Sequence, residues 1–183
     1  MSEPISIAKR LHVPRILWGA LLASQVVYVG VLSAGLVQPE RPPDPIMLPV
    51  LIGTATVVAI ASFLLPEIIR RGAIAKSGIV VHDIPDPEAP IGFRGAAPTI
   101  RGYADPARVI ARAFPLGFTP LILSLALAEA ISIFGLTLGV TGHGPEAWAG
   151  FFAVGMTLTA IRFPTADTFL RPIEKHTGVR LPR

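Results

Sequence analysis

Four apolar stretches, separated by polar connections, account for most of this chain. They cover residues 16–37, 46–65, 116–140 and 147–163. About 20 apolar residues in a helix cross the hydrocarbon core of a bilayer, and each stretch meets or approaches that length. The pattern therefore predicts an all-α fold, a four-span transmembrane helical bundle that forms a single membrane domain.

The connections predict how the spans pair. Residues 38–45 are rich in proline and residues 141–146 form a tight polar turn, so each joins two spans into an antiparallel hairpin. Residues 67–112 are too long for a turn and are predicted to be a mostly irregular loop, whose beginning extends the second span. Within it, Asp105-Pro106 is typical of an N-cap and a first-turn proline, which predicts a short basic helix before the third span.

Composition supports the membrane assignment and excludes several classes of site. The chain has 183 residues, of which 51% are hydrophobic and 15% are charged, against about 25% charged in soluble domains. Mean hydropathy is +0.61. Cysteine is absent, which excludes disulfides and thiolate chemistry, and no phosphate loop, metalloprotease helix or serine nucleophile elbow is present. We therefore expect no enzymatic activity, catalytic residue, metal or cofactor.

Basic residues predict the orientation, because they gather near particular span ends. With the exception of Arg41, they precede the first span, lie between the second and third spans or mark the end of the fourth span. They are Lys9, Arg10, Arg15, Arg70, Arg71, Lys76, Arg94, Arg101, Arg108, Arg112, Arg162, Arg171, Lys175, Arg180 and Arg183. By the positive-inside rule, both termini, the 67–112 loop and the 164–183 tail lie in the cytoplasm, as expected for a protein of a bacterial inner (plasma) membrane. This placement favours anionic lipid headgroups at the cytoplasmic face as partners, and not nucleic acid.

Glu129 is the only carboxylate within the four apolar stretches. A charge near the bilayer centre costs about 2.5 to 3.5 kcal/mol on insertion scales, so such residues usually face a protein interior. A carboxyl in a close helix contact is poorly hydrated, which favours its neutral form. In that form it donates a hydrogen bond or exchanges a proton. Glu129 is therefore the candidate ion-binding residue.

Small and polar residues accompany Glu129. Helical spacing places small side chains in a stripe along the third span, where another helix can approach closely; they are Ser124, Ala128, Ser132, Gly135 and Gly139. Candidate hydrogen-bond partners of the carboxyl are Ser24, Gln25, Ser132 and Thr137. The sequence does not decide among these partners, because the choice depends on helix rotation. Ser24 also aligns with Glu129 in a short internal echo at an offset of 105 residues, within Leu22-Ala23-Ser24 and Leu127-Ala128-Glu129.

Residues 127–136, Leu-Ala-Glu-Ala-Ile-Ser-Ile-Phe-Gly-Leu, resemble the carboxylate helix of the proteolipid subunit c of rotary ATP synthases. The resemblance covers about ten residues, and the predicted orientation of the third span agrees with it. It implies that Glu129 binds a proton or a cation and that neighbouring copies form a ring.

Two functions follow from these observations. One is a structural or accessory membrane component that forms a homo-oligomer or binds another membrane protein, with the Glu129 carboxyl used in helix packing. The alternative is a proton- or cation-translocating unit with Glu129 as the binding carboxylate.

Overall fold

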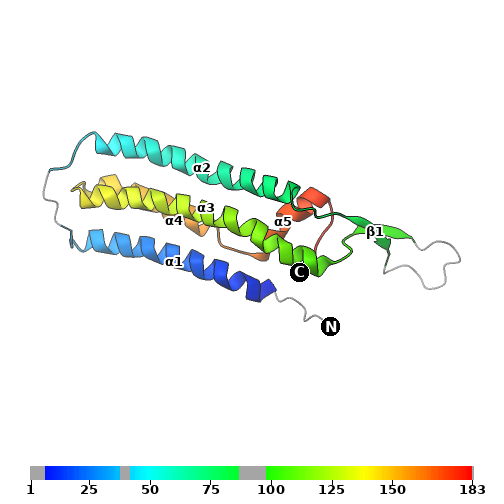
Figure 1. The fold of residues 1–183 in the computed structure, drawn as a ribbon. Coiled ribbons are helices and arrows are strands. Elements are labelled where there is room, and N and C mark those ends of the chain that lie inside the picture. Colours follow the sequence, from blue (N-terminus) through cyan, green and yellow to red (C-terminus); the bar gives the residue numbers. More distant parts are fainter. Residues whose placement is uncertain (1–6, 38–41, 87–97, 183) are drawn as a thin grey trace.

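The computed structural model describes residues 7–37, 42–86 and 98–182. Within them lie five helices: α1 (Ile7–Ser33), α2 (Met47–Ala75), α3 (Pro106–Val140), α4 (Pro145–Ala160) and α5 (Ala166–Thr177). A small antiparallel hairpin joins β1 (His82–Pro85) to β2 (Thr99–Gly102), with His82 opposite Gly102 (Figure 1). The predicted all-α class is confirmed.

Among the described helices, α1, α2 and α3 are long and apolar enough to cross a membrane. By length and composition they fit a membrane protein. The fourth apolar stretch differs, because α4 has 16 residues. At a rise of about 1.5 Å per residue it is roughly 24 Å long, less than the hydrocarbon core of about 30 Å.

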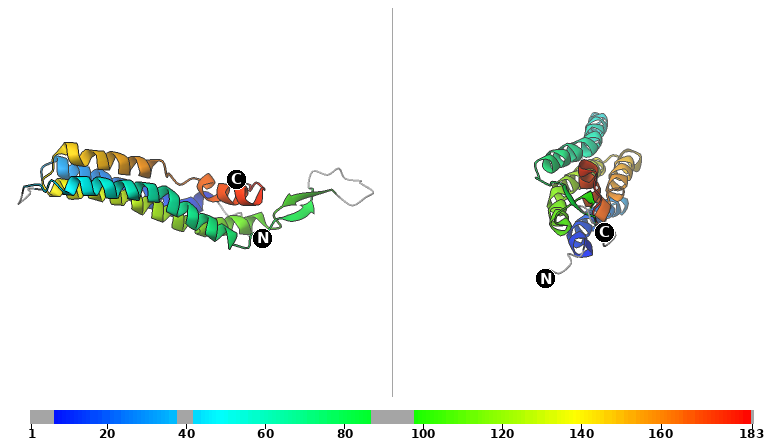
Figure 2. Two further views of the ribbon diagram at one scale, coloured as in Figure 1. Left: turned by 90° about the horizontal axis from the view of Figure 1, so that it is seen from above. Right: turned by 90° about the vertical axis from the view of Figure 1, so that its right-hand side faces the viewer.

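Helix α3 is the centre of the bundle. It packs along α1, α2, α4 and α5, and Figures 1 and 2 show α1 and α2 on opposite sides of it. The helices α1 and α2 are antiparallel, as the connection at residues 38–45 predicted, but they do not pack along one another. A short proline-rich connection makes the second helix run antiparallel to the first, but it does not determine which helix the second one packs against.

The predicted 67–112 loop is shorter in the structure. Helix α2 continues to Ala75, and α3 begins at Pro106, so both ends of this segment are helical. The Asp105 side chain caps α3 by accepting a hydrogen bond from the Arg108 amide at 2.9 Å, as predicted. The helix that begins there runs on through Pro115 and Pro120 into the third span. Residues 38–41 and 87–97 lie outside the described residues.

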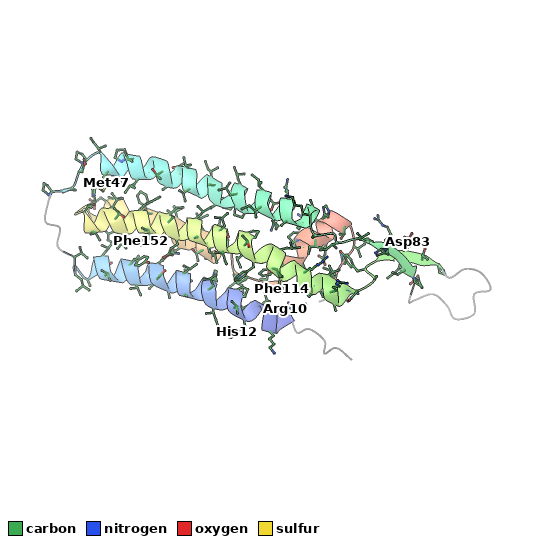
Figure 3. The ribbon with its side chains drawn as sticks, in the orientation of Figure 1. Arg10, His12, Met47, Asp83, Phe114 and Phe152 are labelled. Carbon is green, nitrogen blue, oxygen red and sulfur yellow. The ribbon has the colours of Figure 1, made fainter. Side chains whose placement is uncertain are left out.

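The described residues form two core clusters, which Figure 3 marks by the labelled rings of Phe114 and Phe152. The cluster around Phe152 lies where α1, α2 and α4 surround the second half of α3. The cluster around Phe114 lies at the basic end, which we define as the end where α1 and α3 begin, α2 ends and α5 packs.

Helix α5 closes the basic end. Thr165 caps it through a reciprocal capping box, and Gly178, with a φ of 74°, ends it. Its apolar face buries Phe169, Leu170 and Ile173, and the Phe169 ring stacks on Phe114 with ring centroids 4.7 Å apart. The predicted 164–183 tail is thus a docked helix over much of its length.

The chain after α5 also packs on the bundle. The Tyr103 hydroxyl donates to the carbonyl oxygen of Val179 at 3.1 Å, and the Leu181 amide donates to Glu174 Oε1 at 2.9 Å. The Leu181 side chain is buried. The residues that follow α5 therefore pack against α5 itself and against the residues that precede α3.

Docking of α5 is testable by a matched pair of substitutions. Ile173 is 1% exposed and Ile161 is 62% exposed. We expect Ile173→Ala to cost about 2–5 kcal/mol of local stability, because it leaves a cavity under α5. Ile161→Ala should change stability by less than about 0.5 kcal/mol. Hydrogen exchange of the α5 amides in detergent micelles measures both, and equal exchange in the two variants would contradict the docked arrangement.

Candidate functional site

The Glu129 carboxyl lies between α3 and α1. The residue is 8% exposed, and its Oε1 atom lies 2.7 Å from the hydroxyl oxygen of Ser24 on α1. Of the partners suggested by the sequence, Ser24 is therefore the one that reaches it. Ser24 and Glu129, the two residues that align in the internal echo, face each other. They do so because α1 and α3 run parallel, with both helices starting at the same end of the bundle (Figure 1).

The Ser24 hydroxyl has two acceptors within reach. Its oxygen lies 2.7 Å from the carbonyl oxygen of Leu21 and 2.7 Å from Glu129 Oε1. A serine hydroxyl has one proton, so the Glu129 carboxyl shares this donor with a backbone carbonyl oxygen of α1.

The second oxygen of Glu129 has no such contact. Oε2 is buried and has no hydrogen-bond partner among the described residues. A buried polar atom without a partner is costly in an apolar environment.

A second polar cluster joins three helices next to Glu129. The Gln25 amide of α1 donates to Thr159 Oγ1 of α4 at 2.9 Å, and Ser132 of α3 donates to Gln25 Oε1 at 2.9 Å. All three residues are fully buried. The Trp18 indole of α1 also donates to the Thr159 carbonyl oxygen at 2.8 Å. We call Gln25, Ser132 and Thr159 the three-helix cluster.

Glycines let the helices come this close. A Cβ atom on Gly155 of α4 would lie 2.1 Å from Ser132 Oγ and 3.0 Å from the Ala128 carbonyl oxygen. On Gly135 it would lie 2.9 Å from Phe151 Cβ, and on Gly139 it would lie 2.4 Å from a methyl carbon of Leu32 on α1. The small-residue stripe of α3 therefore lies against α4 and α1 of the same chain.

Two predicted residues do not join either cluster. Thr137 and Ser124 donate to carbonyl oxygens of their own helix, those of Ile133 and Leu121. Conversely, sequence reasoning missed Thr159 and Gly155. The signal was present, because these two residues lie four apart and share one face of the fourth apolar stretch.

Arg162 ties the end of α4 to α2. Its guanidinium donates to the Ser62 hydroxyl at 2.8 Å and to the Ser62 carbonyl oxygen at 3.1 Å. It also lies 4.9 Å from the centroid of the Phe63 ring, within range of a cation–π interaction. The charge at this end of α4 is thus bound to protein groups of the neighbouring helix.

No group of three or more His, Cys, Asp or Glu side chains that could hold a metal occurs in the part of the chain that the structure describes. Comparison of the chain with models of protein families, with curated proteins and with solved structures finds no match. Glu129 and the three-helix cluster are therefore the features of the chain from which a function is inferred.

The glycine contact of α4 gives a second prediction. In Gly155→Ala the new methyl group forces Ser132 away from Gln25 or α4 away from α3, so we expect a loss of about 1–3 kcal/mol. Gly150 is the matched control, because nothing lies within 4 Å of a Cβ atom built there. Gly150→Ala should be neutral or stabilising by up to about 1 kcal/mol, through helix propensity. Unfolding by SDS in mixed micelles compares the two, and a Gly155→Ala variant as stable as the control would contradict the close contact.

Proposed function

We propose that the protein is a multi-pass integral membrane protein with a structural or accessory role, in which the Glu129 carboxyl fastens α1 to α3. The observation that carries the proposal is the hydrogen bond between Glu129 and Ser24, at 2.7 Å, inside one chain. A carboxyl that serves packing needs a partner on a neighbouring helix of the same molecule. Glu129 has such a partner and is 8% exposed.

The proposal includes α4 as a fourth, short span. Helix α4 runs back along α3 and buries Trp148, Phe151 and Phe152 against it, while Val154 on its other side is exposed. A span shorter than the hydrocarbon core is accommodated by local thinning of the bilayer and by flanking charged residues. Arg162, just after α4, is such a flanking charged residue.

The proposed orientation places the basic end in the cytoplasm of a bacterial cell, with the connections 38–45 and 141–146 outside. Association with a second copy or with another membrane protein is part of the proposal. It would use the exposed outer faces of α1 and α2, where Val27 and Val57 are more than half exposed. The small-residue stripe of α3 is already occupied by α1 and α4.

Two observations favour the alternative function, translocation of a proton or a cation. Glu129 Oε2 is buried without a partner among the described residues, and residues 127–136 resemble the carboxylate helix of the proteolipid subunit c. An ion carrier of that kind exchanges its ion reversibly at the carboxyl. The hydrogen bond to Ser24 gives the packing role the stronger support.

Replacement of Glu129 separates the two functions. Glu129→Gln retains an oxygen that accepts a hydrogen bond from Ser24 and loses the titratable group, so we expect stability within about 0.5 kcal/mol of wild type. Glu129→Ala should lose about 0.6–2 kcal/mol, the usual range for a hydrogen bond between membrane helices. Unfolding by SDS gives the stabilities, and proton flux is measured in reconstituted vesicles.

Each arm of this experiment has a decisive outcome. The packing role predicts no flux above that of protein-free vesicles, in the wild type and in both variants. Wild-type flux that Glu129→Gln abolishes would establish translocation instead. Ser24→Ala is the matched control, because its effect on stability should largely disappear when Glu129 is already Ala.

A further inference from the structure

A cleft of about 790 Å³ lies at the basic end, between the last turns of α2 and the polar face of α5. Its walls carry four cationic side chains, Arg70, Arg71, Arg171 and Lys175, and two carboxylates, Glu67 and Asp167. The cleft therefore has an excess of positive charge, and His176 lies on the same wall.

The carboxylates leave many of the cationic donors available. Glu67 is shared, since it pairs with both Arg70 and Arg71, the latter at 2.7 Å. Asp167 lies 3.6 Å from Arg171 Nε. An arginine carries five N–H donors in a planar fork that matches a phosphate or a carboxylate. Three arginines and Lys175 thus offer more donors than two carboxylates can accept.

A second, less polar hollow of about 290 Å³ adjoins the cleft and shares Glu67, Arg70 and Thr168 with it. Apolar side chains of three segments line it, among them Phe63, Leu121, Ile161 and Phe163, and the Arg162 guanidinium, which is bound to Ser62, also borders it. Its Ser62 and Phe63 lie at the end of the apolar 46–65 stretch, whereas Arg70 and Arg71 lie about two turns further along α2. The two hollows thus follow the order of a lipid, with an apolar part next to a charged part.

We propose that the cleft binds the phosphate of an anionic phospholipid and that the adjoining hollow takes the first part of its acyl chains. The ligand is recognised by charge and by fork geometry at Arg70 and Arg71, and by charge alone at Lys175. The amino-terminal turn of α5, with Thr165 in the wall of the cleft, adds amide dipoles that favour an anion. This site is separate from Glu129 and does not depend on the role proposed for it.

A charge-matched pair of double variants tests the site. Arg71→Gln with Lys175→Gln removes two charges from the cleft and leaves the Arg70–Glu67 pair in place. Arg101→Gln with Arg108→Gln removes two charges from exposed positions of β2 and α3 at the same end, outside the cleft. Both purified proteins are titrated with phosphatidylglycerol in neutral detergent, and the retained lipid is counted by native mass spectrometry.

We expect the wild type to retain phosphatidylglycerol in preference to phosphatidylcholine. The cleft variant should bind it roughly tenfold more weakly, and the control variant should stay within about twofold of the wild type. Equal losses in the two variants would overturn the proposal, because they would indicate attraction to general surface charge. Melting curves of both variants verify that each is folded.

Inorganic phosphate separates a lipid site from a site for a soluble anion. If the cleft recognises lipid, the acyl chains contribute to binding, and excess inorganic phosphate leaves the retained phosphatidylglycerol unchanged. If inorganic phosphate displaces the lipid at equal concentration, in wild type and control alike, the cleft is a soluble-anion site and the lipid proposal is overturned.

Discussion

The three-helix cluster is the constraint on which the arrangement of α1, α3 and α4 depends. Hydrocarbon offers no hydrogen-bond partner, so a polar side chain at membrane depth needs one from another helix. The Gln25 amide oxygen accepts a hydrogen bond from Ser132 of α3, and its amide nitrogen donates one to Thr159 of α4. This fixes the rotation of all three helices and their relative heights, which apolar contacts alone specify poorly. The Glu129–Ser24 bond then lies in register beside the cluster.

Short hydrogen bonds between helices require that their backbones come close. Gly155 meets this need, since its missing side chain leaves room for Ser132 to reach Gln25. Gly139 does the same for Leu32 of α1. Polar groups and glycines therefore act together in this bundle. A buried amide without a hydrogen-bond partner would destabilise the fold, and so would a glycine within a helix that allowed no close contact.

The sequence predicted where the helices lie along the chain better than it predicted which helices pack together. Apolar length and the Asp105-Pro106 cap were sufficient to predict helices, since both are local signals. Ser24 was a candidate partner of Glu129, but so was Gln25, and only the rotation of α1 separates them. The docking of α5 and the separation of α1 from α2 depend on contacts between distant segments, such as Phe169 with Phe114. The lone carboxyl drew attention to Glu129, whereas Thr159 and Gly155 gave only the weaker signal of a shared face on the fourth apolar stretch.

The position of α3 between α1 and α2 has a consequence for biosynthesis. Both α1 and α2 pack on α3, which is synthesised after them. Gln25 likewise precedes both of its hydrogen-bond partners, because Ser132 follows it by 107 residues and Thr159 by 134. The first two helices therefore have no common packing partner until the third has been made.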